Sequence, residues 1–314
     1  MANAQPTHPV HFSKFAQAIK DILQANFFDG KKKTDFEYLK NAAISGIRVA
    51  QRFYVPFVQS LFLDRTLTED RKQLIRLPYE CIAVLTNPPF IYDFDDRIPA
   101  ETGWSIAIAF VADSAFNKSF GLLRTQNQDD KDYAFGLLSL IRCPLNHPDP
   151  LLKNRWILAP DVAGIGLPST NDGYLIGVSN TDCARDWGLA NSWDKNRRQL
   201  YFESPFEVIA NACTMLNLHN VKTHSVLPPE KLLKKARKFG HEPLYSYKIL
   251  VVDGERWHDN GRCENKGGSF RSHLRRGHIR RLHDSERRVW VRATFVHGKS
   301  PGFVSKDYEM VAHG

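Results

Sequence analysis

The stretch WSIAIAFV, residues 104–111, is one of five short apolar runs that follow one another after Pro78. The other four are residues 80–85, 133–141, 156–158 and 173–178. Segments rich in turn residues separate them, among them NPP, NQDDKD and PLNHPDP. Short apolar runs bounded in this way are typical of consecutive strands. Because no gap between them holds a convincing crossover helix, we expect a largely antiparallel sheet.

Before Pro78 the hydrophobic pattern is helical. Residues 11–28 carry apolar side chains at helical spacing, and a second helix is expected over residues 34–53. A shorter helical piece, broken near residues 64–68, is expected over residues 58–76. These segments predict an N-terminal helical layer in which aromatic side chains belong to the core. The aromatic residues in question are Phe27, Phe28, Phe53 and Tyr54.

The last third of the chain mixes helix and strand signals. Residues 182–198 are polar and are expected to form an irregular connection. Ser204, Pro205 and Glu207 suit a helix start, with serine as cap and proline at the first helical position. A strand over residues 219–226, a lysine-rich helix opened by Pro228-Pro229-Glu230 and a strand over residues 244–252 follow. Residues 253–270 are expected to be a loop, and residues 302–310 a final strand.

These patterns predict an α+β fold with three parts. We expect an N-terminal helical region over residues 1–76. An antiparallel β-rich region over residues 77–203 is expected to pack against it and to recognise a target. A small basic α+β domain with an antiparallel sheet is expected over residues 204–314.

Composition restricts the class of partner and the compartment. A net charge of +9 and a pI near 9.3 favour anionic partners, and much of the excess lies after Lys231. The five cysteines form no CxxC pair, which suits a reducing compartment. Residues 1–20 lack a secretory signal and no apolar run is long enough to span a bilayer. We therefore expect a cytoplasmic protein that has no membrane partner.

Two clusters of potential ligands bear on whether the chain binds a metal. Asp93, Asp95 and Asp96 lie together but have no histidine at suitable spacing, so a solvated loop is favoured. His273, His278 and His283 lie five residues apart, a spacing that gathers three imidazoles on one face of neither a helix nor a strand. We expect no metal and no cofactor.

The most basic stretch is RSHLRRGHIRRLHDSERRVWVRATFV, residues 271–296, with eight arginines against two acids. We favour a strand over residues 271–282, a turn at Asp284-Ser285 and a second strand over residues 287–296, although a helix remains an alternative. Guanidinium groups suit phosphate oxygens. The residues expected to bind nucleic acid are Arg271, Arg275, Arg280, Arg281, Arg288, Trp290, Arg292, Lys234, Lys235 and Lys238. The three lysines belong to the helix after Pro229, and we expect that helix and the arginines to form one basic surface.

The same stretch could also carry chemistry. Several metal-independent endoribonucleases activate the ribose 2′-hydroxyl with a histidine or carboxylate while arginines hold the phosphate. His273, His278 and Arg276 are the catalytic candidates for such a reaction.

The motif His273-Leu274-Arg275-Arg276-Gly277-His278, followed by a tryptophan-containing strand, resembles the C-terminus of a type V-A anti-CRISPR family. It also resembles the end of uncharacterised phage and plasmid proteins. The resemblance covers about 30 residues, and Arg280 stands where the family has a histidine. It implies an action on the message of a target nuclease during translation, with the N-terminal part recognising the emerging polypeptide.

The leading hypothesis is an RNA-directed protein of a mobile element, such as a phage or plasmid. It would lower expression of a host or defence gene by translation-coupled message cleavage, with RNA and a nascent polypeptide or host protein as partners. One alternative is a non-catalytic protein that binds nucleic acid or the ribosome. A second is an inhibitor that acts by protein contact on a nucleic-acid-binding defence complex.

Overall fold

The computed structural model describes fifteen ranges of the chain. They are residues 12–24, 33–55, 69–87, 104–123, 133–143, 150, 153–159, 162–167, 175–178, 195–252, 271–275, 278–282, 287–291, 294–296 and 300–304. The cluster Asp93, Asp95 and Asp96 and the expected loop over residues 253–270 lie outside these ranges.

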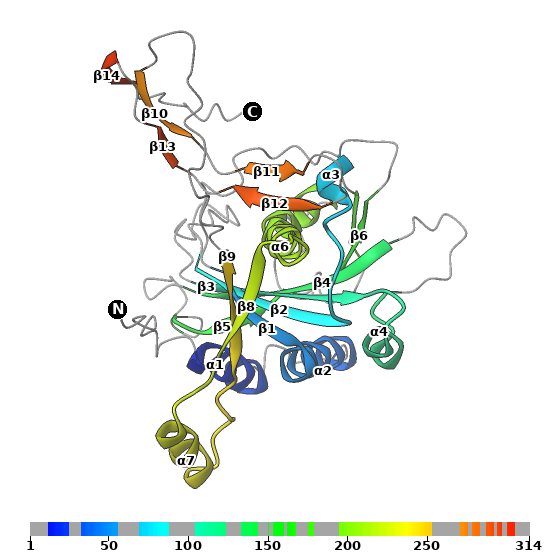
Figure 1. The fold of residues 1–314 in the computed structure, drawn as a ribbon. Helices are drawn as coiled ribbons and strands as arrows, with labels where there is room; N and C mark the ends of the chain where they lie inside the picture. The colour runs from blue at the N-terminus through cyan, green and yellow to red at the C-terminus, as the bar shows by residue number, and fades with distance from the viewer. Residues whose placement is uncertain are drawn as a thin grey trace.

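A nine-stranded sheet forms the centre of the molecule (Figure 1), in the order β7-β6-β4-β3-β2-β1-β9-β8, with β5 paired to β4. Its strands are β1 Gln51–Tyr54, β2 Cys81–Thr86, β3 Trp104–Val111, β4 Tyr133–Arg142, β5 Trp156–Leu158, β6 Ala163–Gly166, β7 Leu175–Val178, β8 Val221–Val226 and β9 Tyr247–Val252. All its pairings are antiparallel except those of β1 with β2 and β9, which are parallel. The α+β class with a largely antiparallel sheet is confirmed. The sheet draws strands from all three expected segments, and their division into domains stays a prediction.

Helices cover both faces of this sheet. In Figure 1, α1 (Phe12–Gln24), α2 (Lys33–Val49) and α4 (Ala115–Phe120) lie below it, and α6 (Lys195–Leu216) lies above. Successive residues of a strand point to opposite faces. In β3, Ile108 and Phe110 accordingly pack with α1 and α2, while Ala107 and Ala109 pack with α6. Because both faces are buried, this strand appears in the sequence as a continuous apolar run.

Two polar contacts tie α1 to the sheet. One carboxylate oxygen of Asp21 accepts a hydrogen bond from the backbone N–H of Trp156 at 3.0 Å. The Lys14 amine lies 4.6 Å from the centre of the Trp104 ring. Burial, together with the nearby charge of Arg142, lowers the pKa of Lys14 to about 8.

The expected helix boundaries were wrong in two places. The second helix ends at Val49, not near Phe53, and residues Gln51–Tyr54 form β1. The expected start of a helix at Ser204 is also wrong, since α6 begins at Lys195 and contains Pro205. An internal proline removes one backbone hydrogen bond. The buried side chains beyond it, such as Phe206 and Ile209, pack on the sheet and offset that loss.

Cys81, Cys143 and Cys213 are buried, and Cys81 and Cys213 are free thiols. Burial raises the pKa of the Cys81 and Cys213 thiols to about 12, so both are inert side chains of the core. Among the residues that the structure describes, none of the helices combines the length and apolar character needed to cross a membrane.

The remaining elements lie around this body. The short helix α3 (Glu69–Lys72) precedes β2, and α7 (Glu230–Lys238) connects β8 to β9. The C-terminal strands are β10 Arg271–Arg275, β11 His278–Arg281, β12 Arg288–Val291, β13 Thr294–Val296 and β14 Ser300–Val304. They form a three-stranded sheet in the order β13-β10-β14 and a two-stranded sheet of β11 and β12.

Candidate nucleic-acid interface

The basic stretch forms an antiparallel hairpin, as the strand interpretation predicted and the helical alternative did not. Leu274 pairs with Phe295 in β10 and β13, and His278 pairs with Val291 in β11 and β12. Both pairings follow one register, and the hydrogen bond from the Leu282 N–H to the Arg287 carbonyl continues it at 3.0 Å. The described strands β10 and β11 both lie within the strand expected over residues 271–282, and residues 276–277 between them lie outside the described residues. The expected turn at Asp284-Ser285 lies outside the described residues.

The β11–β12 hairpin is fixed to the body of the protein. Ile279 packs against a small apolar cluster of Leu74, Met215 and Leu218, near α3 and the end of α6. The Arg288 backbone carbonyl accepts a hydrogen bond from the His219 N–H at 3.0 Å. Its guanidinium Nη2 donates to the Gln73 side-chain oxygen, also at 3.0 Å. These contacts hold the hairpin above α6 in Figure 1.

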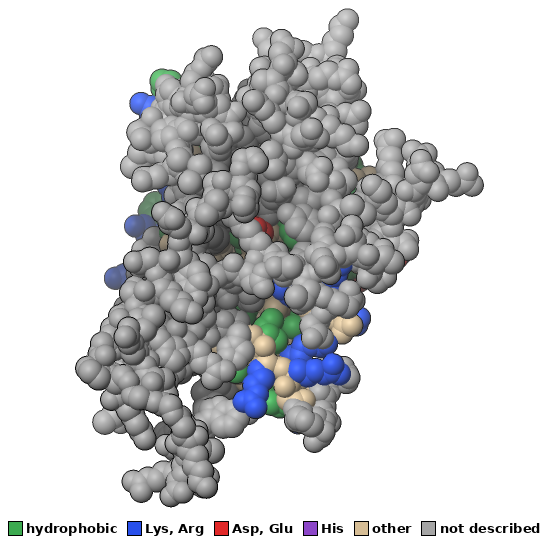
Figure 2. Space-filling view, turned by 90° about the horizontal axis from the view of Figure 1, so that it is seen from above, with side chains coloured by type: hydrophobic (Ala, Val, Ile, Leu, Met, Phe, Trp, Pro, Cys, Tyr) green, Lys and Arg blue, Asp and Glu red, His purple; other side chains and the backbone are tan. Residues whose placement is uncertain are grey.

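Three arginines at the closed end of this hairpin are exposed: Arg280, Arg281 and Arg287. Arg281 lies directly opposite Arg288 in the ladder, so positive charge is concentrated at that point. Figure 2 shows the molecule from the side on which β11 and β12 lie, and described lysine and arginine side chains gather there beside hydrophobic ones. An exposed guanidinium presents a planar set of donors that matches the oxygens of a phosphate.

The structure describes only some of the catalytic candidates. His273 lies in β10 and His278 in β11, and the two strands belong to different ladders. Arg276 and His283 lie outside the described residues. Within the described part of the chain, no group of three histidine, cysteine or acidic side chains could hold a metal ion. The catalytic roles of His273, His278 and Arg276 therefore stay predictions.

The structure also describes only some of the other residues expected to bind nucleic acid. Arg271 and Arg275 lie in β10, and Trp290 lies in β12 opposite Ile279. Arg292 is outside the described residues. For these four residues the structure describes at most the backbone, and their contacts with nucleic acid stay predictions.

The expectation of one basic surface shared by α7 and the arginine stretch was wrong. Lys234, Lys235 and Lys238 are exposed on α7. Figure 1 places α7 at the bottom of the molecule and the C-terminal strands at the top. The reason is topological, because α7 joins β9 at its first residue, whereas the chain leaves β9 at its other end toward β10. The length of β9 separates the two basic regions.

Sequence reasoning did not identify the residues that anchor the hairpin. Gln73 and His219 are distant in sequence from Arg288, and no local pattern marks them as its partners. Comparison of the chain with protein-family models found no match, and neither did comparison with curated proteins. The resemblance of the motif over residues 273–278 to the anti-CRISPR family thus stays a prediction.

Proposed function

We propose that this protein binds RNA in the cytoplasm through the β11–β12 hairpin and thereby lowers expression of a target gene. It would do so as the product of a mobile element. The observation that carries the proposal is the group of exposed arginines Arg280, Arg281 and Arg287 at the end of an anchored hairpin. The net charge of +9 gives it long-range attraction for a polyanion.

The anchoring supports binding in a physical way. An arginine on a free segment loses backbone and side-chain freedom when it contacts a phosphate. Here the backbone of β11 and β12 is already held by the hydrogen bonds between the two strands and by the packing of Ile279. The hydrogen bond from the Arg288 guanidinium to Gln73 holds it as well. Less free energy is therefore spent on ordering when a phosphate binds.

The test is binding of a labelled single-stranded RNA to the full chain. The variant Arg280→Gln/Arg281→Gln/Arg287→Gln removes three charges from the hairpin. Lys20→Gln/Lys118→Gln/Lys153→Gln is the matched control, because it removes the same charge from exposed lysines elsewhere. We expect the hairpin variant to bind at least about tenfold more weakly at low salt, and the control to bind nearly as the parent does. Equal affinities of the two variants would contradict the proposal.

A second candidate is metal-independent cleavage of the bound RNA. The observation that favours it is the position of His278, which opens β11 two residues before Arg280. In such a reaction a histidine takes the proton of a ribose 2′-hydroxyl, whose oxygen attacks the adjacent phosphorus. The 5′-oxygen leaves with a proton from a general acid, while arginine stabilises the charge on the phosphate.

Cleavage and binding are separable by experiment. Labelled message is incubated with the protein and a chelator in buffer, and separately with the protein in a translation extract that contains no chelator. If the protein cuts, His273→Ala and His278→Ala should abolish the products while RNA binding is retained. Intact message in both settings removes the enzymatic candidate and leaves the binding function.

Action on expression needs its own control. A reporter message translated in the extract should yield less protein when the parent chain is added, and the hairpin variant should lose this effect. If an inhibitory complex with a host protein instead survives nuclease treatment and high salt, inhibition by protein contact is the correct function.

A further inference from the structure

We infer that α7 is a second, separate contact site for single-stranded RNA, at the opposite end of the molecule from the hairpin. The sequence of α7 is EKLLKKARK, residues 230–238, with five basic side chains and one acid. In Figure 1 it lies beyond α1 and α2 at the end of the β8 and β9 strands. This inference goes beyond the function proposed for the hairpin and does not depend on it.

The helix is well defined by its own ends. Pro229 precedes it and Glu230 lies in its first turn, where a negative charge is favourable. At its other end the His241 N–H bonds to the Ala236 carbonyl at 3.0 Å and the Gly240 N–H to the Arg237 carbonyl at 3.2 Å. Gly240 has a φ of +62°, as this type of helix end requires. The basic residues are therefore held on a regular helix.

The basic side chains lie on the outward side of α7. At about 100° per residue, Lys231, Lys234, Lys235, Arg237 and Lys238 occupy roughly 160° of the circumference. Ala236, at the middle of the opposite side, is buried. On the apolar side Leu232 is 38% exposed, and all five basic side chains are exposed.

An exposed aromatic ring borders this basic side. Phe239 is 58% exposed and stacks against His241, with ring centroids 6.0 Å apart and an interplanar angle of 28°. A row of cations beside an exposed aromatic ring is the combination with which proteins hold single-stranded nucleic acid. The cations contact successive phosphates, and an unstacked base lies on the ring.

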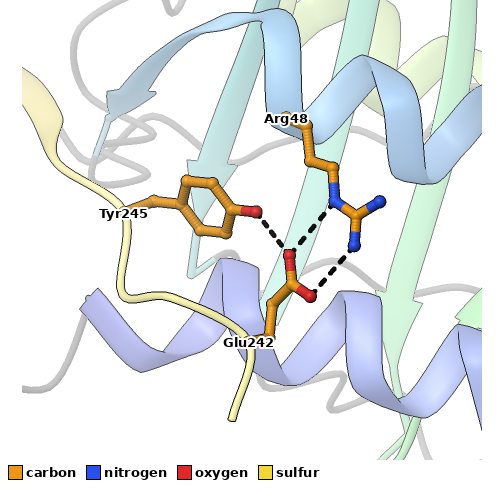
Figure 3. A network of polar contacts seen from close by, with 3 residues as sticks. All are labelled: Arg48, Glu242 and Tyr245. Carbon is orange, nitrogen blue, oxygen red and sulfur yellow. Dashed lines mark hydrogen bonds and ion pairs between the residues drawn. The ribbon is translucent and has the colours of Figure 1, made fainter. Parts of the chain in front are cut away.

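We call the segment that runs from β8 through α7 to β9 the arm. A polar network fixes its base (Figure 3). Arg48 of α2 donates from Nε and Nη2 to the two carboxylate oxygens of Glu242, at 3.2 and 3.0 Å. The Tyr245 hydroxyl donates to Glu242 at 2.5 Å. The Arg52 guanidinium lies 4.7 Å from the centre of the Tyr245 ring and donates from Nε to the Ser246 carbonyl. The segment that returns from α7 to β9 is therefore held on α2 and β1.

These observations favour RNA over a membrane or an acidic protein. A membrane surface would take up the apolar side of an amphipathic helix. In α7 that side offers little apolar surface, because Ala236 at its middle is buried and Leu232 is only 38% exposed, whereas five basic side chains are exposed. An acidic protein would use the lysines but would gain little from a stacking platform at Phe239.

The first test measures binding of a labelled oligo-uridine to the full chain. Lys234→Gln/Lys235→Gln/Lys238→Gln should lower affinity several-fold, and Phe239→Leu about tenfold because the stacked base is lost. Lys20→Gln/Lys118→Gln/Lys153→Gln is the control with equal charge, and circular dichroism verifies that each variant is folded. The three lysine substitutions are then repeated in the hairpin variant Arg280→Gln/Arg281→Gln/Arg287→Gln. The oligo-uridine binding that this variant retains should fall further when Lys234, Lys235 and Lys238 are also changed.

The second test places a photoreactive phenylalanine analogue at position 239 of the parent and of the hairpin variant. We expect a crosslink to oligo-uridine in both proteins, which would establish the arm as a site even if the hairpin binds no RNA. The inference is overturned if no crosslink forms and the α7 and Phe239 variants bind oligo-uridine as the control does. It is also overturned if poly-glutamate or phosphatidylserine vesicles compete fully for the arm and Phe239→Leu leaves all binding unchanged.

Discussion

The central sheet and the β11–β12 hairpin are both largely antiparallel, yet they differ in the exposure of their side chains. In β3 the residues from Ser105 to Phe110 are all buried between two layers of helices. In the hairpin one face contacts the body through Ile279, and Arg280 and Arg281 remain exposed. The sheet is stabilised by apolar burial, and the exposed arginines contribute little to the core. Substitutions should therefore separate stability from binding, according to which region they affect.

The largest expected effect is a loss of stability from Gly136→Ala in β4. A Cβ built at this glycine would lie 2.2 Å from the Phe110 Cζ, whose ring is fully buried. We expect the free energy of unfolding to fall by about 2–3 kcal/mol through overpacking, measured by urea denaturation. Ala134→Ser is the control, because it also adds one atom but at an exposed position of the same strand. A loss of RNA binding without a loss of stability would contradict the separation of the two regions.

A somewhat smaller effect is expected from Asp21→Ala in α1. The change removes the acceptor for the backbone N–H of Trp156 and for the Gln17 side-chain amide. Leaving a buried donor unpaired should cost about 1–3 kcal/mol of unfolding free energy. Asp21→Asn keeps one acceptor oxygen and should cost less, and an equal cost for both variants would show that this hydrogen bond is not the cause.

Lys14 should make the stability of the sheet depend on pH. Its folded pKa of about 8 lies below the ordinary value of 10.5, so the unfolded chain binds its proton more readily. The resulting destabilisation is full below pH 8 and disappears as the pH rises toward 10.5. Lys14→Met should therefore gain most stability over the parent near neutral pH and least near pH 10.5. Lys20→Met, at an exposed position of the same helix, is the matched control.

The smallest expected change in global stability comes from Ile279→Ala in β11. Its side chain is half-buried against Leu74, Met215 and Leu218, so the loss should be about 1 kcal/mol or less. Amide hydrogen exchange should accelerate in β11 and β12 but not in β3, because the anchor acts locally. RNA affinity should fall with it, since the arginines lose their fixed positions. Uniform acceleration across the sheet would show that the hairpin and the sheet unfold together.

Local patterns predicted much of the fold. The strands β2, β3, β4, β8 and β9 and the helices α1 and α7 coincide with apolar runs, helical spacing or helix-start signals. Two strands of four residues each, β6 and β1, were missed, and β1 follows α2 almost directly. Its pairing with Lys248 and Ile249 of β9 joins residues almost two hundred positions apart, which no local pattern records.

The candidate site was predictable in composition but not in position. The arginine stretch was evident from charge, and alternation favoured the hairpin. Its anchoring by Gln73 and His219 depends on tertiary contacts. The separation of α7 from the hairpin follows from the membership of β8 and β9 in the central sheet, whereas the sequence pattern had assigned both strands to the small sheet of the C-terminal domain.

The most direct test of the central claim is the salt dependence of RNA binding. For single strands, the logarithm of the affinity falls with the logarithm of salt concentration by about 0.7 for each phosphate contact. We predict that Arg280→Gln/Arg281→Gln/Arg287→Gln reduces the magnitude of this slope by about 2, corresponding to three lost contacts. The control Lys20→Gln/Lys118→Gln/Lys153→Gln should keep the slope of the parent. An unchanged slope in the hairpin variant would contradict the assignment of the β11–β12 hairpin as the RNA-binding site.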